Sequence, residues 1–218
     1  ILKAYQKFIS NLSAKGKLIV NEDDKNLQKL NTEEFNTSGF SLNQPEAEKI
    51  KEALKMPGKH NIYNGLASLQ VGQALGINQQ VTLNALSEFK GVWRRFDIKK
   101  KLKSGKTITI INDYAHHPTE IEATLEAADE KFPEQKKWAI FQPHQIARTE
   151  NLSEEFIQTF KNVEVDKLIV TDIYKVAGRE EESEITSKKL VEKVNKDNVV
   201  YIPQDKLKTF LSDKLEKK

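Results

Sequence analysis

The chain has 218 residues, of which 38% are hydrophobic and 31% are charged, with a formal net charge of +3 and no cysteine. This length allows one or two domains with a sizeable core, and the composition is typical of a soluble globular protein. The lack of cysteine excludes disulfides and thiolate metal sites and suits the cytoplasm. No apolar run approaches the roughly 20 residues that a membrane helix needs, and the basic run at 99–103 carries no aromatic residues that would favour a nucleic-acid partner.

The first part of the chain predicts a mainly helical region with one short strand. Apolar residues recur with helical spacing in four segments, at 1–12, 45–55, 59–75 and 78–89. Residues 17–20 are expected to form a strand and 25–30 a helical turn, whereas 31–44 show no regular pattern. The first helix begins without a cap or an initiator methionine, which suggests a piece of a longer protein.

Strands and helices alternate regularly beyond a domain boundary that we place between residues 93 and 94. A hairpin is expected over 96–101 and 107–111, followed by strands at 138–141, 167–171 and 199–202 and helices at 118–132, 151–160, 186–194 and 205–215. Strands separated by such helices predict right-handed crossovers and a mainly parallel sheet. The fold class is therefore α/β, with a Rossmann-like domain over 94–218 that includes an antiparallel hairpin, and a partial α/β domain over 1–93.

Three of the four histidines lie on two loops that are expected to share one edge of this sheet. The segment 112–120 reads Asn-Asp-Tyr-Ala-His-His-Pro-Thr-Glu, and 141–149 reads Phe-Gln-Pro-His-Gln-Ile-Ala-Arg-Thr. Loops at the carboxyl ends of parallel strands bind ligands, so His116, His117, His144 and Arg148 favour a site for an anionic group. A third loop adds Asp172, Tyr174 and Arg179. Any one of these residues alone fits an ordinary surface loop, and the set is poor in the carboxylate ligands of a metal cage.

A second group of polar side chains stands at the start of the predicted helix 59–75. Asn61 and Asn64 are three residues apart and share a helix face, beside His60. Carboxamides donate and accept hydrogen bonds, so they suit a flat heterocycle. The alternative is that Asn61 merely caps the helix.

Six motifs in order resemble the Mur ligases, and within that family the enzymes that join L-alanine to UDP-N-acetylmuramate. They are Gly-Lys-His-Asn-Ile-Tyr-Asn-Gly-Leu-Ala (58–67), Gly-Val-Trp-Arg-Arg-Phe-Asp (91–97), Asn-Asp-Tyr-Ala-His-His-Pro-Thr-Glu-Ile (112–121), Phe-Gln-Pro-His (141–144), Ala-Arg-Thr (147–149) and Asp-Ile-Tyr (172–174). The resemblance implies an ATP-dependent ligase of peptidoglycan synthesis that works through an acyl phosphate, with Mg²⁺ held by residues upstream. It also implies that 1–93 is the end of a central ATPase domain. The Gly-rich phosphate loop is absent from this sequence, so the chain alone is expected to be inactive without the N-terminal part of the same protein.

The resemblance also assigns roles to individual residues. It implies that His60, Asn61 and Asn64 contact the adenine, and that Arg95 and Asp113 approach the ribose and phosphates across the domain junction. The amino-acid end would be lined by Tyr114, His116, His144, Gln145 and Arg148, of which His116, His144 and Arg148 would be catalytic. His117 is expected to be structural. Gln145 stands where the L-alanine-adding enzymes commonly carry arginine, which places more of the carboxylate binding on Arg148.

Two other functions remain open on the sequence. One is a related ligase such as the murein peptide ligase, which shares the Ala-His-His-Pro loop and differs in its acceptor. The other is a binding protein derived from the fold without catalytic activity, in keeping with Gln145 and the missing phosphate loop. A redox enzyme is disfavoured because no Gly-x-Gly-x-x-Gly motif opens a βαβ unit.

Overall fold

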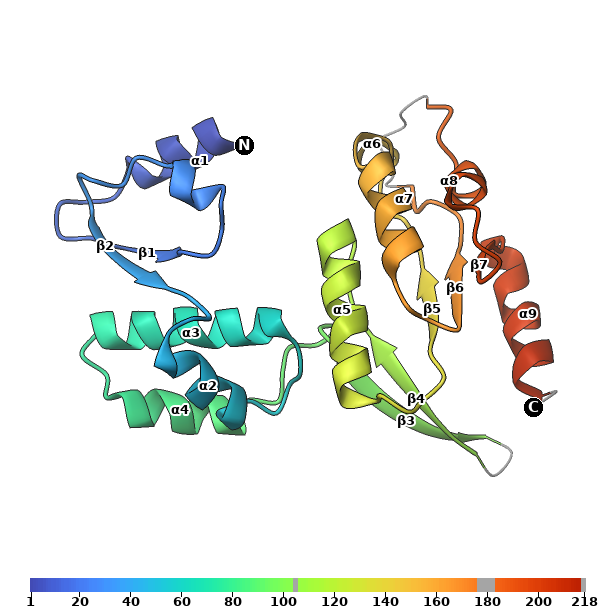
Figure 1. Cartoon of the computed structure of the whole chain (residues 1–218), viewed down its shortest axis with the longest axis horizontal. Helices are drawn as coiled ribbons and strands as arrows, with labels where there is room; N and C mark the ends of the chain where they lie inside the picture. Colours follow the sequence, from blue (N-terminus) through green and yellow to red (C-terminus); the bar gives the residue numbers. More distant parts are fainter. Residues whose placement is uncertain (104–105, 176–182, 217–218) are drawn as a thin grey trace. The chain divides into compact units, whose positions relative to one another are not determined.

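The computed structural model describes residues 1–103, 106–175 and 183–216. The chain divides into two compact units, Ile1–Asn112 and Asp113–Lys218, and each is described by itself (Figure 1). The predicted domain boundary between 93 and 94 stays a prediction. Among the described residues, no helix combines the length and the apolar character that crossing a bilayer requires.

The first unit contains four helices and two separate two-stranded sheets among its described residues. The elements are α1 (Leu2–Ile9), β1 (Lys17–Asn21), the 3-10 turn η1 (Leu27–Lys29), β2 (Asn36–Phe40), α2 (Pro45–Ala53), α3 (Lys59–Ala74), α4 (Gln79–Glu88), β3 (Asp97–Lys103) and β4 (Lys106–Asn112). Strands β1 and β2 pair in parallel, and β3 and β4 form the predicted antiparallel hairpin.

Strand β2 is the element of this unit that the sequence did not predict. Its residues, Asn-Thr-Ser-Gly-Phe, show no alternation of apolar and polar side chains. The strand is held instead by parallel pairing with β1, in which Leu18 lies opposite Thr37, and by Phe40, which is buried in the core. Tertiary pairing thus outweighs local propensity here.

The core of the first unit lies between α2, α3 and β2. It is built from Phe40, Ile50, Leu66 and Leu69, all buried. Gly65 allows α3 to approach α2, since a Cβ atom at that position would lie 2.5 Å from the Ile50 side chain. A larger residue at 65 would therefore push the two helices apart.

The second unit is a three-layered α/β structure around a parallel sheet. Its elements are α5 (Pro118–Lys131), β5 (Trp138–Phe141), α6 (Ile146–Asn151), α7 (Ser153–Asn162), β6 (Lys167–Val170), α8 (Ser187–Val194), β7 (Val199–Tyr201) and α9 (Gln204–Glu216). The strand order is β5-β6-β7, and both pairings are parallel. The predicted α/β fold with a parallel sheet is confirmed, and the carboxyl ends of the three strands lie at one edge.

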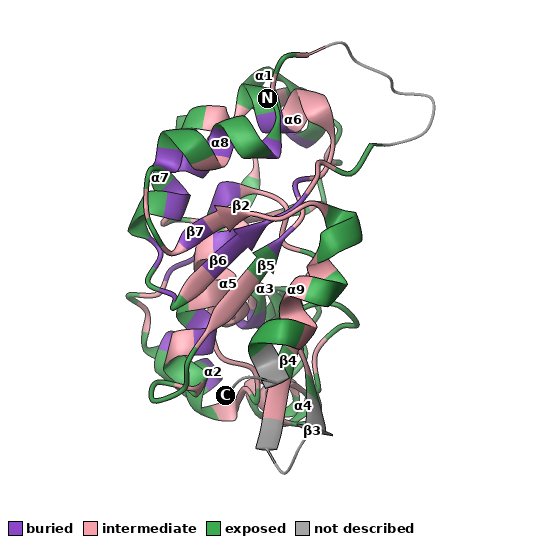
Figure 2. Cartoon of the chain, turned by 90° about the vertical axis from the view of Figure 1, so that its right-hand side faces the viewer, coloured by how far each residue is buried: buried purple, intermediate pink, exposed green. Residues whose placement is uncertain are grey.

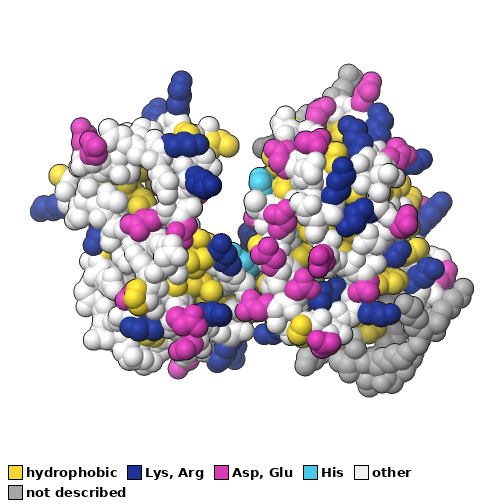
Figure 3. Space-filling view, viewed as in Figure 1, with side chains coloured by type: hydrophobic (Ala, Val, Ile, Leu, Met, Phe, Trp, Pro, Cys, Tyr) yellow, Lys and Arg dark blue, Asp and Glu magenta, His cyan; other side chains and the backbone are white. Residues whose placement is uncertain are grey.

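The central strand β6 and helix α7 form the middle of the core of this unit, to which β5, α5, α8 and β7 also contribute. Leu168, Ile169 and Val170 are fully buried, and Figure 2 shows the buried residues gathered on β6 and on one side of α7. Phe156 and Phe160 of α7 pack on Phe141 of β5 with ring centroids 5.5 and 5.7 Å apart. On the outer face that Figure 3 shows, acidic and basic side chains are interspersed over this unit.

Candidate functional site

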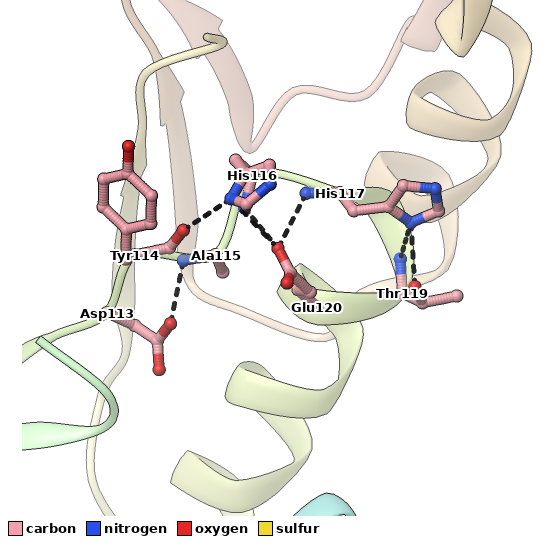
Figure 4. Close-up of polar contacts among 7 residues, drawn as sticks. All are labelled: Asp113, Tyr114, Ala115, His116, His117, Thr119 and Glu120. Carbon is pink, nitrogen blue, oxygen red and sulfur yellow. Dashed lines mark hydrogen bonds and ion pairs between the residues drawn. The ribbon is translucent and has the colours of Figure 1, made fainter. Parts of the chain in front are cut away.

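The loop between β4 and α5 carries two of the histidines and is shaped by short-range hydrogen bonds (Figure 4). The Asp113 carboxylate accepts the backbone N–H of Ala115 at 2.8 Å, which turns the chain directly at the start of the second unit. Glu120 Oε2 accepts the N–H groups of His116 and His117 at 2.8 and 3.2 Å. The loop is therefore held from both sides by carboxylates.

The two neighbouring histidines of this loop have different surroundings. His117 is the N-cap of α5: its Nδ1 accepts from the Thr119 backbone N–H at 3.4 Å and lies 2.8 Å from Thr119 Oγ1, and Glu120 completes a capping box. His116 Nδ1 instead lies 2.9 Å from the Tyr114 carbonyl and 3.3 Å from Glu120 Oε2. This geometry agrees with a structural part for His117.

His144 lies on the loop after β5 and is surrounded by rings from two other loops. Its imidazole stacks on Tyr174 with centroids 5.1 Å apart, and the Tyr114 ring lies at 6.4 Å from it and at 5.5 Å from His116. The structure thus brings the two histidine loops together. The prediction that both leave one edge of the same sheet is wrong, because among the described residues β4, which precedes the first loop, pairs with β3 and not with the β5-β6-β7 sheet. Partial burial, followed by the charges of Arg148 and His116, lowers the pKa of His144 below its ordinary value of 6.5.

Arg148 lies in the short helix α6 and Gln145 is the N-cap residue of that helix, where the sequence predicts a loop. Thr149 is buried, and its hydroxyl donates to the Gln145 carbonyl at 2.8 Å, which closes the first turn. Gln145 itself has φ 71°, a conformation that side chains other than glycine rarely adopt. Arg148 is half-buried, and within the described ranges no carboxylate lies within ion-pair distance of its guanidinium.

Asp172, which the sequence also placed on this edge, supports the sheet. Its carboxylate accepts hydrogen bonds from the Tyr201 hydroxyl and from the Gln204 backbone N–H, the latter at 2.8 Å. These bonds keep the pKa of Asp172 below its ordinary value and raise the pKa of Tyr201 to about 12. Arg179 lies outside the described residues.

In the first unit, the residues expected to meet adenine lie together at the start of α3. The N-cap is Gly58, with φ 99°, so Asn61 does not cap this helix. The Asn61 amide donates to the Pro57 carbonyl at 2.7 Å, which orients the side chain and leaves its Oδ1 as an acceptor. His60 is half-buried and Asn64 is exposed on the same stretch.

The two residues expected at the nucleotide phosphates belong to different units. Arg95 is an exposed residue of the first unit, and Asp113 begins the second. The neighbouring Arg94 guanidinium lies 5.1 Å from the Trp93 ring centroid. Among the described residues, no cluster of three or more histidine, aspartate or glutamate side chains suits a metal ion.

Asp23 is a half-buried residue that joins three parts of the first unit and that the sequence did not single out. Its carboxylate accepts from Ser41 Oγ at 2.7 Å, the Leu42 N–H at 2.9 Å and the Tyr63 hydroxyl at 3.0 Å. These bonds, the one from Leu42 first, lower the pKa of Asp23. The acidic pair after the strand at 17–20 was the available signal, and it reads as an ordinary polar turn.

Comparisons with known proteins show the family of the chain. A family model described as "Mur ligase, glutamate ligase domain" matches residues 94–214. The chain belongs to the Mur ligase family. It is 37% identical over 223 residues to the UDP-N-acetylmuramate–L-alanine ligase of Clostridium acetobutylicum, a match that covers 91% of this chain and 47% of that protein.

Two solved structures of Mur ligases share the fold. The UDP-N-acetylmuramate-alanine ligase of Thermotoga maritima matches with a TM-score of 0.56 and 30% identity over 72% of this chain and 32% of its own. MurF from Acinetobacter baumannii matches with a TM-score of 0.71 over 99% of this chain and 49% of its own, and its 14% identity shows likeness of fold alone. The chain thus spans about a third to a half of the Mur ligases that it matches.

Proposed function

We propose that this chain supplies part of the active site of an ATP-dependent ligase that joins L-alanine to UDP-N-acetylmuramate in peptidoglycan synthesis. The carrying observation is the cluster of His144, His116 and Arg148, in which the Tyr114 ring contacts both imidazoles, with centroids 5.5 Å from His116 and 6.4 Å from His144. The name and 37% identity of the Clostridium acetobutylicum relative support this substrate pair. ATP and a UDP-linked substrate favour the cytoplasm as the compartment.

In this proposal His144 accepts the proton of the attacking amine. The α-ammonium group of the amino acid must lose a proton before nitrogen attacks the acyl phosphate, forming the C–N bond and releasing phosphate. A histidine whose pKa is lowered below 6.5 is neutral at pH 7 and is able to accept that proton. His116, on the neighbouring loop, would share in binding the amine.

Arg148 is proposed to bind negative charge at the same end of the site. Among the described residues no carboxylate pairs with it, and it lies close enough to His144 to affect the charge of that ring. A half-buried guanidinium suits the amino-acid carboxylate or the oxyanion of the tetrahedral intermediate. Gln145 would add a neutral hydrogen bond to the same group.

The first unit is proposed to supply contacts to ATP. The Oδ1 of Asn61 accepts no hydrogen bond within the described part of the chain and suits the amino group of adenine, because the amide nitrogen of the same side chain donates to the Pro57 carbonyl. His60 and Asn64 would complete this contact. Arg95 and Asp113 are proposed for the ribose and phosphates, and Mg²⁺ would enter with ATP on ligands that we do not assign to this chain.

The test is a phosphate-release assay on the full-length protein with ATP, UDP-N-acetylmuramate and a panel of L-alanine, glycine, L-serine and peptides. We expect L-alanine to give the highest kcat/KM, and we expect the 218-residue chain alone to be inactive. His144→Ala should lower turnover at least 100-fold, the usual worth of a general base. Phosphate release with peptides alone would favour the murein peptide ligase instead, and no release with any acceptor would favour a binding protein.

A further inference from the structure

Tyr174 is joined to the His144 loop by both its backbone and its side chain. The two residues form a parallel bridge in which the Tyr174 N–H donates to the Pro143 carbonyl at 2.7 Å and the Gln145 N–H donates to the Tyr174 carbonyl at 3.1 Å. On this bridge the phenol ring stacks on the imidazole, with 5.1 Å between centroids and 19° between planes. The loops after β5 and β6 are therefore fixed to each other at the point where the rings meet.

The stack leaves the tyrosine half in solvent. Tyr174 is 50% exposed, although its ring covers His144. A large aromatic side chain held half exposed loses part of the stabilisation that full burial would give. Within the described ranges its hydroxyl makes no hydrogen bond, so the contact with His144 is made by the ring.

We propose that Tyr174 is the positioning residue for His144, fixing the plane of the imidazole and covering one of its faces while Tyr114 approaches from another side. This inference rests on the proposed function, in which His144 accepts the proton of the amine. A base must lie within hydrogen-bond reach of that proton, so a fixed ring plane contributes directly to the rate. An imidazole free to rotate about its side-chain bonds would spend much of its time misaligned.

The groups around His144 set the pKa of its imidazole, which can be measured. Arg148 of α6 and His116 of the neighbouring loop act on its charge, and Tyr114 and Tyr174 are the two rings beside it. Removal from water is the largest cause of its lowered pKa. Removing the Tyr174 ring should rehydrate the imidazole and let its pKa rise toward 6.5.

The first experiment is proton NMR of the 218-residue chain, in which only four histidines contribute imidazole signals. We expect a nuclear Overhauser contact between the His144 and Tyr174 rings. In Tyr174→Leu the His144 signal should lose its ring-current shift and titrate at higher pH, whereas Tyr174→Phe should keep both. Tyr5→Leu is the matched control, because Tyr5 is also 50% exposed and belongs to the other unit.

The second experiment is the full-length enzyme assayed across pH. Tyr174→Leu should lower kcat roughly tenfold and move the acidic limb of the kcat profile to higher pH, and Tyr174→Phe should restore both. A missing contact between the rings, or an unchanged His144 titration in Tyr174→Leu, would overturn the proposal even if one variant folds poorly. So would a changed titration with unchanged kcat. Failure of the proposed function gives a different result. His144→Ala would then keep full turnover, although the NMR experiment still showed the contact between the His144 and Tyr174 rings.

Discussion

The Tyr201 hydroxyl at the end of β7 donates a hydrogen bond to the Asp172 carboxylate, which follows β6, and the Gln204 N–H at the start of α9 donates to the same carboxylate. This contact fastens two neighbouring strands and the last helix at the edge that also carries His144. The Asp172 carboxylate therefore has a structural role at this edge.

We expect Tyr201→Phe to lower the free energy of unfolding by about 1 kcal/mol, the worth of a hydrogen bond to a charged group reduced for partial exposure. The folded-state pKa of Tyr201 lies at about 12, above its ordinary 10.0, so this contribution is complete below pH 10 and is lost as the pH rises to 12. The Asp172 contribution is also stabilising but has the opposite pH dependence: it is present above pH 3.8 and is lost as the pH falls through the lowered folded-state pKa. Urea unfolding across pH measures both limbs, and an unchanged alkaline limb in Tyr201→Phe would contradict the assignment.

The capping box predicts that substitution of His117 lowers the stability of the fold without changing the chemistry of the reaction. His117→Ala removes the acceptor for the Thr119 N–H and should cost about 1 kcal/mol of unfolding free energy. His117→Asn should retain most of it, because asparagine is a strong N-cap. If His117→Ala unfolds at the same urea concentration as the parent chain, the cap contributes nothing.

The network at Asp23 predicts acid sensitivity of the first unit. Asp23→Asn should destabilise the chain at pH 7, because a carboxamide offers one acceptor oxygen to three donors. The pKa of Asp23 is lowered, so its contribution is present above pH 3.8 and disappears as the pH falls below that value. Asp24→Asn is the matched control, since among the described residues the Asp24 carboxylate accepts only from the nearby N–H groups of Asn26 and Leu27. Equal losses of stability in Asp23→Asn and Asp24→Asn, measured by thermal unfolding, would show that the Asp23 network contributes no more than a local turn.

Much of the fold was predictable because its elements carry strong local patterns. The strands of the parallel sheet are short apolar runs, and the helices between them repeat apolar residues with helical spacing. The loop position of His144 followed from the carboxyl edge of the parallel sheet. The loop of His116 does not share that edge, because it follows β4, which among the described residues pairs with β3 in the antiparallel hairpin. The elements that escaped prediction, β2 and α6, depend on long-range pairing and on the buried Thr149 hydroxyl.

Contacts between residues far apart in the sequence could not be predicted from the residue pattern. Nothing in the residue pattern links Asp23 to Tyr63, which is 40 positions away, or places the Tyr174 ring on His144. The difference between His116 and His117 likewise depends on which side chain turns back to the helix N-terminus. Periodicity predicts faces and edges, whereas hydrogen-bond partners depend on the packed structure.

The positive φ of Gln145 predicts a gain of stability from glycine at this position. Gln145→Gly should raise the unfolding free energy by about 1 kcal/mol, because relief of backbone strain exceeds the added freedom of the unfolded chain. Asn195→Gly is the control, since asparagine tolerates its left-handed conformation, with φ 51° and ψ 50°, and little gain is expected. A loss of stability in Gln145→Gly by urea unfolding would show that the side chain holds the loop.

Arg148 offers a direct test of the electrostatics of the site. Its positive charge is one cause of the lowered pKa of His144, so Arg148→Gln should raise that pKa toward 6.5. The histidine is then protonated over a wider acidic range, and in the full-length enzyme the acidic limb of kcat/KM for L-alanine should move to higher pH. The KM for L-alanine should also increase roughly tenfold, because a charge-assisted hydrogen bond to the carboxylate is lost.

Arg94→Gln is the control for Arg148→Gln, because Arg94 lies on the first unit beside Trp93 and carries the same charge. It should leave the His144 titration, followed by NMR, where it was. If Arg148→Gln and Arg94→Gln shift the pKa of His144 equally, the shift comes from the net charge of the chain. Arg148 and His144 are then not specifically coupled. If Arg148→Gln moves the titration but leaves KM unchanged, Arg148 tunes the base without binding the amino-acid carboxylate, and Gln145 becomes the residue to test for that contact.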